Sequence, residues 1–354
     1  MANRLSNSQI TKYSQCGMSY KLHYIDKIRP SKLHSALLFG SAFDTATQVL
    51  LEPEKHKGKT AEEVFSDSWT YQDIDGVRTY IPDNITLVYA NSDFDADLVM
   101  YAMFKETKEE ILTLVSKRKD NGYNNLGDVE KALVNKIFWS CLQKKGLLFI
   151  KAFREQVLPK VTKVHSTQEA VELSNGEDTV TGFIDAVLEW EGYYHPIVTD
   201  FKTSSMKYEE DSVATSQQLS LYCNAVSEKY NTDLAAYIVF NKNIIKNRKK
   251  ICSKCKYDGS GKSHKTCPNE LGDKRCNSAW DETLDPQVFV QVIISAIPDR
   301  TTEIVLENFD EINKAIKAEI FPRNLAVCGD LFGRPCPYKG YCFKNDMEGL
   351  TKKS

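Results

Sequence analysis

Apolar residues follow two kinds of pattern along this chain, one typical of strands and one typical of helices. Residues 180–190 and 196–203 are rich in β-branched and aromatic residues and flank a Glu191-Gly192 turn signal, so they predict two neighbouring antiparallel strands. The mixture of strand and helix patterns predicts an α/β fold. The same patterns predict the remaining elements: strands at 235–241 and 288–296, and helices within 1–30, 33–51, 53–150, 208–230 and 302–320.

Two acidic residues and a lysine occur where the neighbouring strands can bring them together. Because alternate residues of a strand share a face, Asp200 and Lys202 point to one side, and Asp185 can reach that side from the adjoining strand. Two converging carboxylates suit Mg²⁺, which binds oxygen ligands, water and substrate phosphate. A lysine beside the ion orients water and offsets charge that develops at phosphorus. Taken alone, the same residues also fit a surface hairpin with an ordinary solvated ion pair.

The helix at 208–230 carries Gln218 and Tyr222 one turn apart on the same face. By themselves, these residues are also explained by a packed tyrosine beside an amide. Together, however, G-x-x-D ending at Asp185, D-x-K at Asp200 to Lys202, and Q-x-x-x-Y on the next helix resemble the PD-(D/E)XK nuclease superfamily, in particular its RecB-like branch. The resemblance implies a restriction-endonuclease-like core, in which a mixed central sheet is flanked by helices.

The resemblance also implies roles for individual residues. Asp185 and Asp200 would bind Mg²⁺ or Mn²⁺, Lys202 would be catalytic, and Gln218 and Tyr222 would support the site and the DNA. Members of the RecB-like branch carry an upstream metal-binding His after a Gly, and here Asp44 stands in that place, after Gly40. An Asp also ligates Mg²⁺, so the exchange bears on metal preference and rate rather than on activity as such. Glu155 resembles a further acidic position of the branch.

Four of the ten cysteines cluster within residues 251–280, which are rich in Gly, Lys, Asn and Ser. No signal peptide is recognisable, so a reducing cytoplasmic setting is expected, and metal sites are favoured over disulfides. Four thiolates close a tetrahedral zinc site, and a segment with so few apolar residues needs such a link to fold. The alternatives are loosely structured thiols, or His264 in place of one cysteine. The spacing C-x2-C-x11-C-x8-C therefore predicts a zinc knuckle formed by Cys252, Cys255, Cys267 and Cys276.

A second group of thiols, Cys328, Cys336 and Cys342, lies near the end of the chain. The segment around Cys16 resembles the opening of the iron-sulfur RecB-like nucleases, which include the AddB nuclease domain and the CRISPR-adaptation exonucleases. The resemblance implies a 4Fe-4S cluster with Cys16 as the fourth ligand. The family's tail is C-x2-C-x5-C, whereas this chain has C-x7-C-x5-C, which leaves a three-cysteine site or zinc as alternatives.

Size and charge are compatible with such an enzyme. The 354 residues are 42% hydrophobic, which is enough for one large core with insertions, and no transmembrane segment is recognisable. The net charge of -2 excludes a globally basic DNA-coating protein, so DNA would have to follow a local basic track. One candidate track lies at 242–250. We expect five regions: N-terminal helices at 1–52, a helical insertion at 53–150, the nuclease core at 151–250, the zinc knuckle at 251–280, and a C-terminal strand, helix and cysteine tail at 281–354.

The sequence thus leads to a Mg²⁺- or Mn²⁺-dependent DNA nuclease with a structural zinc and a 4Fe-4S cluster. The resemblance favours an exonuclease acting on DNA ends or single strands in recombination, repair or phage genome processing, with a helicase or annealing protein as a possible partner. The alternative is a catalytically weak DNA-binding or assembly module that retains the fold, and it is motivated by Asp44 in the His position. The expected location is the cytoplasm, that of the bacterial host if a phage encodes the chain.

Overall fold

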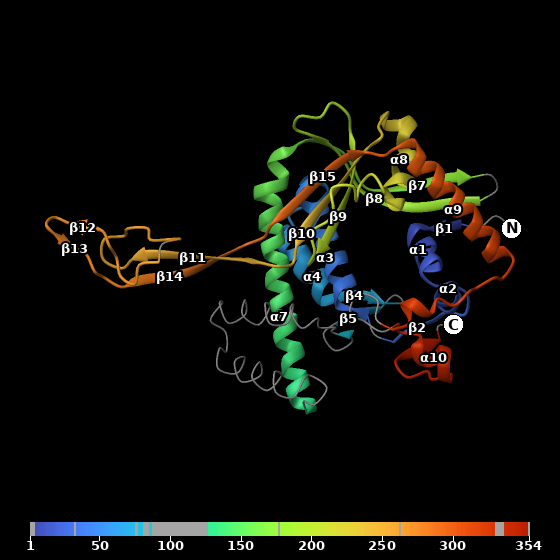
Figure 1. The fold of residues 1–354 in the computed structure, drawn as a ribbon, viewed down its shortest axis with the longest axis horizontal. Helices are drawn as coiled ribbons and strands as arrows, with labels where there is room; N and C mark the ends of the chain where they lie inside the picture. Colours follow the sequence, from blue (N-terminus) through green and yellow to red (C-terminus); the bar gives the residue numbers. More distant parts are fainter. Residues whose placement is uncertain are drawn as a thin grey trace.

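A mixed six-stranded sheet forms the centre of the molecule (Figure 1). The computed structural model describes residues 4–31, 33–74, 77–80, 85–86, 127–175, 178–261, 263–329 and 336–352. The strand order is β1-β8-β9-β10-β15, with β7 paired to β8 as well. The sheet strands are β1 (Arg4–Ser6), β7 (Val161–Asn175), β8 (Asp178–Trp190), β9 (Ile197–Ser204), β10 (Leu234–Asn241) and β15 (Val290–Ala296).

Helices cover both faces of this sheet. Apolar residues of α3 (Ser35–Leu51), α4 (Ala61–Thr70) and α7 (Asp128–Ala152), with the π-helical turn η4 (Phe153–Val157), pack on one face. Residues of α1 (Asn7–Gln15), α8 (Gln217–Tyr230) and α9 (Asp299–Lys317) pack on the other. The arrangement is a restriction-endonuclease-like α/β fold, as the sequence predicts.

Strand β10 shows why a strand in this core is a continuous apolar run in the sequence. Its residues Ala236, Ile238 and Phe240 belong to the first apolar layer, whereas Tyr237 and Val239 belong to the second. A strand buried on both faces needs apolar side chains at every position. Phe240 also stacks on the ring of Phe153 and meets those of Phe43 and Phe149. Burying each such Phe contributes roughly 1.5–3 kcal/mol.

The two ends of the chain lie together. Strand β2 (Ile28–Pro30) pairs with β16 (Leu350–Lys352), and Tyr338 packs with Leu22 in a small apolar cluster of its own. Figure 1 shows both termini on the same side of the molecule, near α1 and α10. The other elements of this region are α2 (Gly17–Tyr20), the π-helical turn η1 (Lys21–Ile25), the 3-10 turn η6 (Leu325–Val327) and α10 (Lys339–Lys344).

A long two-stranded ribbon projects away from this body (Figure 1). It consists of β11 (Ile245–Cys252) and β14 (Trp280–Gln287), which pair over eight residue pairs from Ile245↔Gln287 to Cys252↔Trp280. Beyond the ladder lie the cysteine-rich residues 253–279, including the small hairpin of β12 (Glu270–Leu271) and β13 (Lys274–Arg275). The predicted knuckle is therefore the tip of an extended arm.

The observed elements differ from the predicted ones in several places, and two of these concern predicted helices. Helix α8 begins at Gln217, because Ser216 caps it by accepting the Leu219 N–H at 3.1 Å, and residues 210–215 form turns instead. The predicted helical insertion at 53–150 also contains a hairpin, β4 with β5. The Asp75-Gly76 pair between two short runs with apolar ends is a local signal that could have predicted it. Besides α4 and α7, the described elements of this stretch and its surroundings are β3 (Leu33–His34), the 3-10 turn η2 (Pro53–His56), β4 (Tyr71–Ile74), β5 (Val77–Tyr80), β6 (Ile85–Thr86) and the 3-10 turn η5 (Leu158–Lys160). The rest of the insertion, residues 87–126, lies outside the described residues.

Candidate active site

The predicted carboxylates lie where strands β8 and β9 separate. The two strands pair antiparallel, as predicted, from Leu188↔Ile197 to Ala186↔Thr199. Beyond that rung β8 pairs in parallel with β1, from Thr179 to Thr181. Asp185 sits at the fork, and its Oδ2 accepts the Phe201 N–H at 2.9 Å. The side chain thus satisfies a backbone donor of β9 where the β8–β9 ladder has ended.

On β9, Asp200 and Lys202 form a closed triangle with Gln218 of α8. Asp200 Oδ2 lies 2.5 Å from Lys202 Nζ, and Gln218 Nε2 donates to Asp200 Oδ1 at 2.9 Å. Lys202 Nζ in turn donates to Gln218 Oε1 at 3.2 Å. Asp200 is only 2% exposed, so its charge is compensated by the ammonium rather than by water.

Tyr222 completes this face of the site and depends on a glycine. Its hydroxyl lies 3.4 Å from Gln218 Nε2, one helical turn away. The tyrosine ring packs on Gly182 of β8, where an added Cβ would lie 2.5 Å from a ring carbon and 2.8 Å from the hydroxyl. The Gly of the G-x-x-D pattern is therefore explained by close packing against the Tyr of Q-x-x-x-Y.

Asp44 approaches from α3, on the opposite face of the sheet. Both of its carboxylate oxygens accept hydrogen bonds from Gln168 Nε2, at 3.1 and 3.0 Å. Gln168 lies in β7 between the residues that pair with Ala186 and Ile184, opposite Asp185, and its φ of 47° is left-handed. Such a conformation is uncommon for a residue with a Cβ and is often found at functional sites. No motif in the sequence marks Gln168 or Gln48, which also hydrogen-bonds Asp44.

The electrostatics of the site are those of three acids around one cation. Burial raises the pKa of Asp44 to about 6, and the neighbouring Asp200 adds to the effect. Burial, then Asp200 and Asp44, raise the pKa of Asp185 well above its ordinary value. For Lys202, burial lowers the pKa, but the facing Asp200 and Asp185 outweigh it and raise the pKa above its ordinary value. The lysine is therefore a firmly protonated ammonium, and the site retains an excess of acidic groups.

These residues fit a hard divalent cation. Asp200 Oδ2 is buried and accepts no hydrogen bond, because the nearby Lys202 ammonium satisfies its charge but not its hydrogen-bond geometry. A buried carboxylate oxygen that accepts no hydrogen bond, with two further acids close by, is the kind of donor set that Mg²⁺ or Mn²⁺ prefers. The ligand oxygens of Asp44, Asp185 and Asp200 do not all lie within 4.8 Å of one another, so this site is more open than the cysteine site described next.

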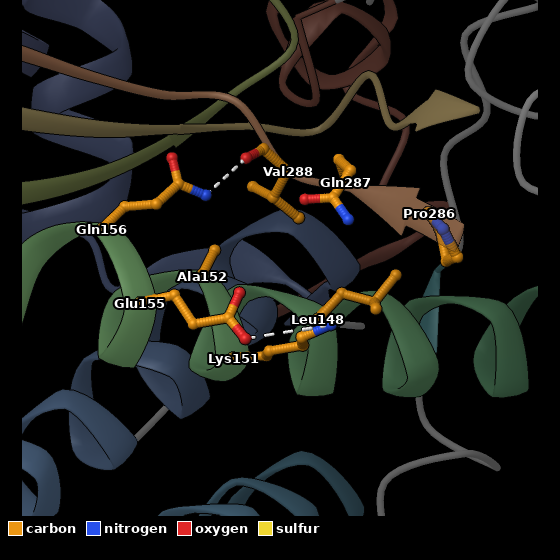
Figure 2. A pocket seen from close by; sticks show the side chains of 8 residues that line it. All are labelled: Leu148, Lys151, Ala152, Glu155, Gln156, Pro286, Gln287 and Val288. Carbon is orange, nitrogen blue, oxygen red and sulfur yellow. Dashed lines mark hydrogen bonds and ion pairs between the residues drawn. The ribbon is translucent and has the colours of Figure 1, made fainter. Parts of the chain in front are cut away.

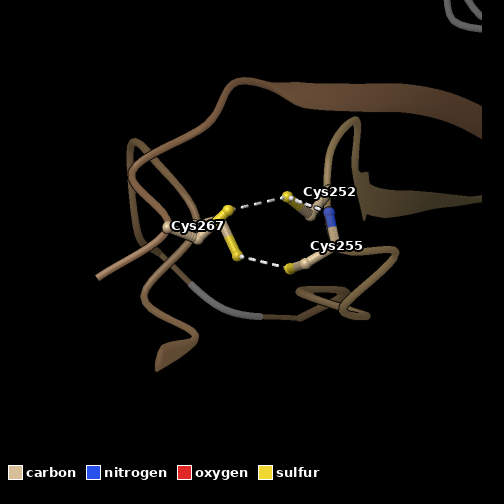
Figure 3. A group of neighbouring side chains, drawn as sticks. Cys252, Cys255 and Cys267 are labelled. Carbon is tan, nitrogen blue, oxygen red and sulfur yellow. Dashed lines mark hydrogen bonds between the residues drawn. The ribbon is translucent and has the colours of Figure 1, made fainter. Parts of the chain in front are cut away.

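The four knuckle cysteines gather as the spacing predicts, and Figure 3 labels Cys252, Cys255 and Cys267 of this group. Within the described residues they are the one group of three or more candidate ligands whose atoms all lie within 4.8 Å of one another. Cys255 also receives a hydrogen bond from Asn269 Nδ2 at 3.5 Å. Burial raises the pKa of Cys255, but this bond and its backbone and thiol partners outweigh burial and lower the pKa to about 6. His264 is not in the group; its backbone carbonyl accepts the indole N–H of Trp280. Four cysteines in this arrangement suit zinc or an iron-sulfur centre.

The second set of cysteines is looser. Burial raises the pKa of Cys342, and the thiols of Cys336, Cys16 and Cys328 act on it as neighbours, so all four lie in one region. Lys12 is also close: burial lowers its pKa, whereas Cys336 and Cys16 raise it. Residues 330–335, between Cys328 and Cys336, lie outside the described residues.

Glu155 is placed elsewhere. It lies in η4, its side chain is 55% exposed, and its ion-pair partner is Lys151 at 3.9 Å. Figure 2 shows it lining a small crevice between α7 and β14, where Gln156 Nε2 donates to the Val288 carbonyl at 2.9 Å. The structure therefore gives Glu155 no contact with Asp44, Asp185 or Asp200 among those it describes.

Comparison with known proteins gives the family. The model of the PD-(D/E)XK nuclease superfamily matches residues 99–343, more than half of the chain. The chain belongs to this superfamily. Members of the superfamily are nucleases that use divalent metal ions, and such a fold implies a DNA substrate. The matched PD-(D/E)XK region includes the fork with Asp185, the triangle with Lys202, and Tyr222.

A phage protein is also similar to this PD-(D/E)XK chain. The Gene 69 protein of Mycobacterium phage L5 is 25% identical over 238 residues, which cover 64% of this chain and 72% of the phage protein. Within the described residues, no helix has both the length and the apolar character to cross a membrane.

Proposed function

We propose that this protein is a Mg²⁺- or Mn²⁺-dependent deoxyribonuclease whose reaction takes place at the fork between β8 and β9. The observation that carries the proposal is the triangle of Asp200, Lys202 and Gln218, with Asp185 and Asp44 on either side. Asp44, Asp185 and Asp200 would hold the ion. When bound, the ion supplies Lewis-acid stabilisation of negative charge on the scissile phosphate.

The roles of the side chains follow from their contacts. In hydrolysis a water oxygen bonds to phosphorus, one P–O ester bond breaks, and the water proton balances the departing oxygen. Lys202, kept protonated by Asp200 and Asp185, donates hydrogen bonds and positive charge to the developing oxyanion rather than accepting the water proton. Gln218 holds the ammonium at 3.2 Å, and Tyr222 holds Gln218 in place.

We further propose exonuclease action, with a 4Fe-4S cluster on Cys16, Cys328, Cys336 and Cys342 and structural zinc in the knuckle. The resemblance to iron-sulfur RecB-like nucleases and the gathering of the four thiols beside the joined chain ends support the cluster. We also propose a role in phage recombination or genome processing in the host cytoplasm, with a helicase or annealing protein as partner. The similarity to a phage protein supports the phage setting alone.

Digestion of DNA tests the proposal. End-labelled linear DNA and covalently closed circular DNA are incubated with Mg²⁺ or Mn²⁺ and with wild type, Lys202→Ala or Lys163→Ala. Lys163 is a matched control, because it is an exposed lysine of β7. It forms an ion pair with Glu189, which is not a residue of the triangle. We expect wild type and Lys163→Ala to degrade linear DNA and Lys202→Ala to be inactive.

Two results would contradict the proposal in different ways. If wild type cuts no substrate under any condition, the enzyme hypothesis is wrong, and the weak DNA-binding module motivated by Asp44 takes its place. If circles are cut as fast as linear DNA, the exonuclease hypothesis is wrong. Anaerobic purification tests the cluster: iron, sulfide and visible absorbance support it, whereas a colourless protein with two zinc ions excludes it.

A further inference from the structure

The arm formed by residues 245–287 does not contribute to the apolar core that stabilises the fold. None of its described side chains belongs to the three apolar clusters of the protein. Its order comes from the β11–β14 ladder, the small β12–β13 hairpin and the four knuckle cysteines. A two-stranded ribbon without a packed face is marginally stable in water. The protein thus maintains a projecting element that adds little to its core, which indicates a role outside the fold.

The arm carries a charge opposite to that of the rest of the chain. Residues 245–287 contain ten Lys and Arg against six Asp and Glu, a net charge of +4, and the whole chain has -2, so the remainder carries -6. The arm's tip includes five exposed cationic residues: Lys254, Lys256, Lys265, Lys274 and Arg275. A polyanion would therefore be repelled by most of this chain and attracted to the arm.

The arm leaves the body at the edge that carries Lys202. Strands β9 and β10 run parallel with Lys202 opposite Val239 and Ser204 opposite Asn241, and the arm begins four residues after Asn241. Two cations, Lys207 and Lys242, follow the ends of β9 and β10 in the sequence. Lys207 Nζ lies 5.0 Å from the centre of the half-exposed Phe289 ring, and Lys242 Nζ lies 5.4 Å from that of Phe39.

We propose that the arm is a second DNA-binding element, whose cationic tip contacts backbone phosphates of the substrate away from the scissile bond. This inference rests on the proposed DNA nuclease function. Eight residue pairs of ladder span about 27 Å at ~3.4 Å per residue. That length equals about eight phosphate spacings along one DNA strand. A DNA shorter than this, bound at the triangle, does not reach the tip.

DNA affinity measured without cleavage tests the inference. In the Lys202→Ala background, fluorescence anisotropy compares labelled hairpins with stems of about 6 and about 30 base pairs. The arm variant carries Lys274→Glu and Arg275→Glu. The control variant carries Lys57→Glu and Lys59→Glu, an equal charge change at exposed lysines of the body. Zinc content shows that the arm variant keeps its knuckle.

We expect the arm variant to bind the long stem more weakly than the parent. Its affinity should also fall about tenfold less than that of the parent between 50 and 200 mM salt, because the loss of two phosphate contacts lowers the salt slope by about 1.8. Its affinity for the short stem and the control variant's affinity for both stems should equal those of the parent. The inference would be overturned if the arm variant lost the same affinity for short and long stems, or if the control variant lost as much affinity as the arm variant. It would also be overturned if the arm variant lost no affinity. The anisotropy measurement needs no DNA cleavage. An inactive wild type would therefore refute the proposed nuclease function, and the affinities would still show whether the arm binds DNA.

Discussion

Gln168 is a residue whose importance lies in its geometry rather than in a motif. Its amide reaches both oxygens of Asp44, and its left-handed backbone places that amide opposite Asp185. A ligand that is held by an outer partner loses less freedom when it binds a metal. The Asp in the usual His position is thus supported by a dedicated hydrogen-bond donor.

Replacing Gln168 tests this support. We expect Gln168→Ala to lower Mn²⁺ affinity about 10-fold or more, since outer-shell partners have effects of this size. Gln168→Gly should lose the same affinity while gaining stability, because glycine adopts the left-handed conformation without strain. The control is Gln217→Ala, which removes a side-chain hydrogen bond that Gln217 donates to Asn7 and that involves none of the three acids. Isothermal titration with Mn²⁺ gives the affinities, and unchanged binding in both Gln168 variants would contradict the role.

Gly182 is a second residue whose importance lies in its geometry, because the Tyr222 ring leaves no space for a side chain there. Adding a methyl group there would force the Tyr222 ring away from Gln218, so we expect Gly182→Ala to lower activity and to destabilise the protein by about 1–3 kcal/mol. Gly40→Ala is the matched control, because its Cβ would meet nothing within 4 Å and lies in a helix. That change should stabilise by about 0.5–1 kcal/mol. Urea unfolding measures both, and equal stability of the two variants would refute the packing explanation.

The raised carboxyl pKa values predict how stability depends on pH. Asp44 has a folded pKa of about 6 against an ordinary value of 3.8, and the pKa of Asp185 is raised as well. The folded state therefore binds more protons, so metal-free protein should lose stability as the pH rises from about 4 to above 6. The loss from Asp44 is at most about 3 kcal/mol. Thermal unfolding across this range should show a weaker dependence in Asp44→Asn, and stability that rises with pH in both proteins would contradict the assignment.

At the scale of elements, the sequence predicts best what depends on local pattern. The apolar runs of β8 and β9 and the turn at Gly192, whose φ is 85°, determine their antiparallel pairing, and that part of the prediction is confirmed. The start of α8 was missed because the Ser216 cap competes with an apolar pattern that extends further upstream. Gln168 was missed because the irregularity of β7 depends on its pairing with β8, which no local pattern encodes.

The arm is the element whose order should depend on a metal. The described side chains of its two strands belong to none of the three apolar clusters, so loss of a thiolate should unfold the tip while the central sheet remains. We expect Cys255→Ser to lose zinc and to exchange amide hydrogens rapidly at 253–279, with β8 to β10 still protected. The sequence allowed His264 as an alternative ligand. We expect His264→Ala to keep both the zinc and the protection, since it is the backbone carbonyl of His264 that accepts the Trp280 indole N–H. Loss of protection throughout the sheet in Cys255→Ser would contradict an independent arm.

At the scale of the whole molecule, the two chain ends form one structural unit. Strand β2 pairs with β16, Tyr13 donates to the Ile320 carbonyl at 2.6 Å, and His23 Nδ1 lies 2.7 Å from the Tyr338 hydroxyl. Burial, then Lys12 and Arg29, lower the pKa of His23 to about 4, so at neutral pH it is an uncharged partner for that hydroxyl. These contacts join segments more than 300 positions apart in the sequence, which explains why local patterns could not predict them.

A cluster on Cys16, Cys328, Cys336 and Cys342 would add a covalent link between these ends, and its removal should loosen them together. We expect Cys342→Ser, or cluster removal by oxidation and chelation, to lower the thermal midpoint by several degrees and to speed amide exchange at 28–30 and 350–352. Cys223→Ala is the control, because this buried thiol contacts the Leu234 carbonyl inside the second apolar layer. It should cost stability without changing exchange at the ends. If Cys342→Ser leaves β2 and β16 as protected as in wild type, the ends are held by packing and hydrogen bonds alone, and the cluster has no structural role.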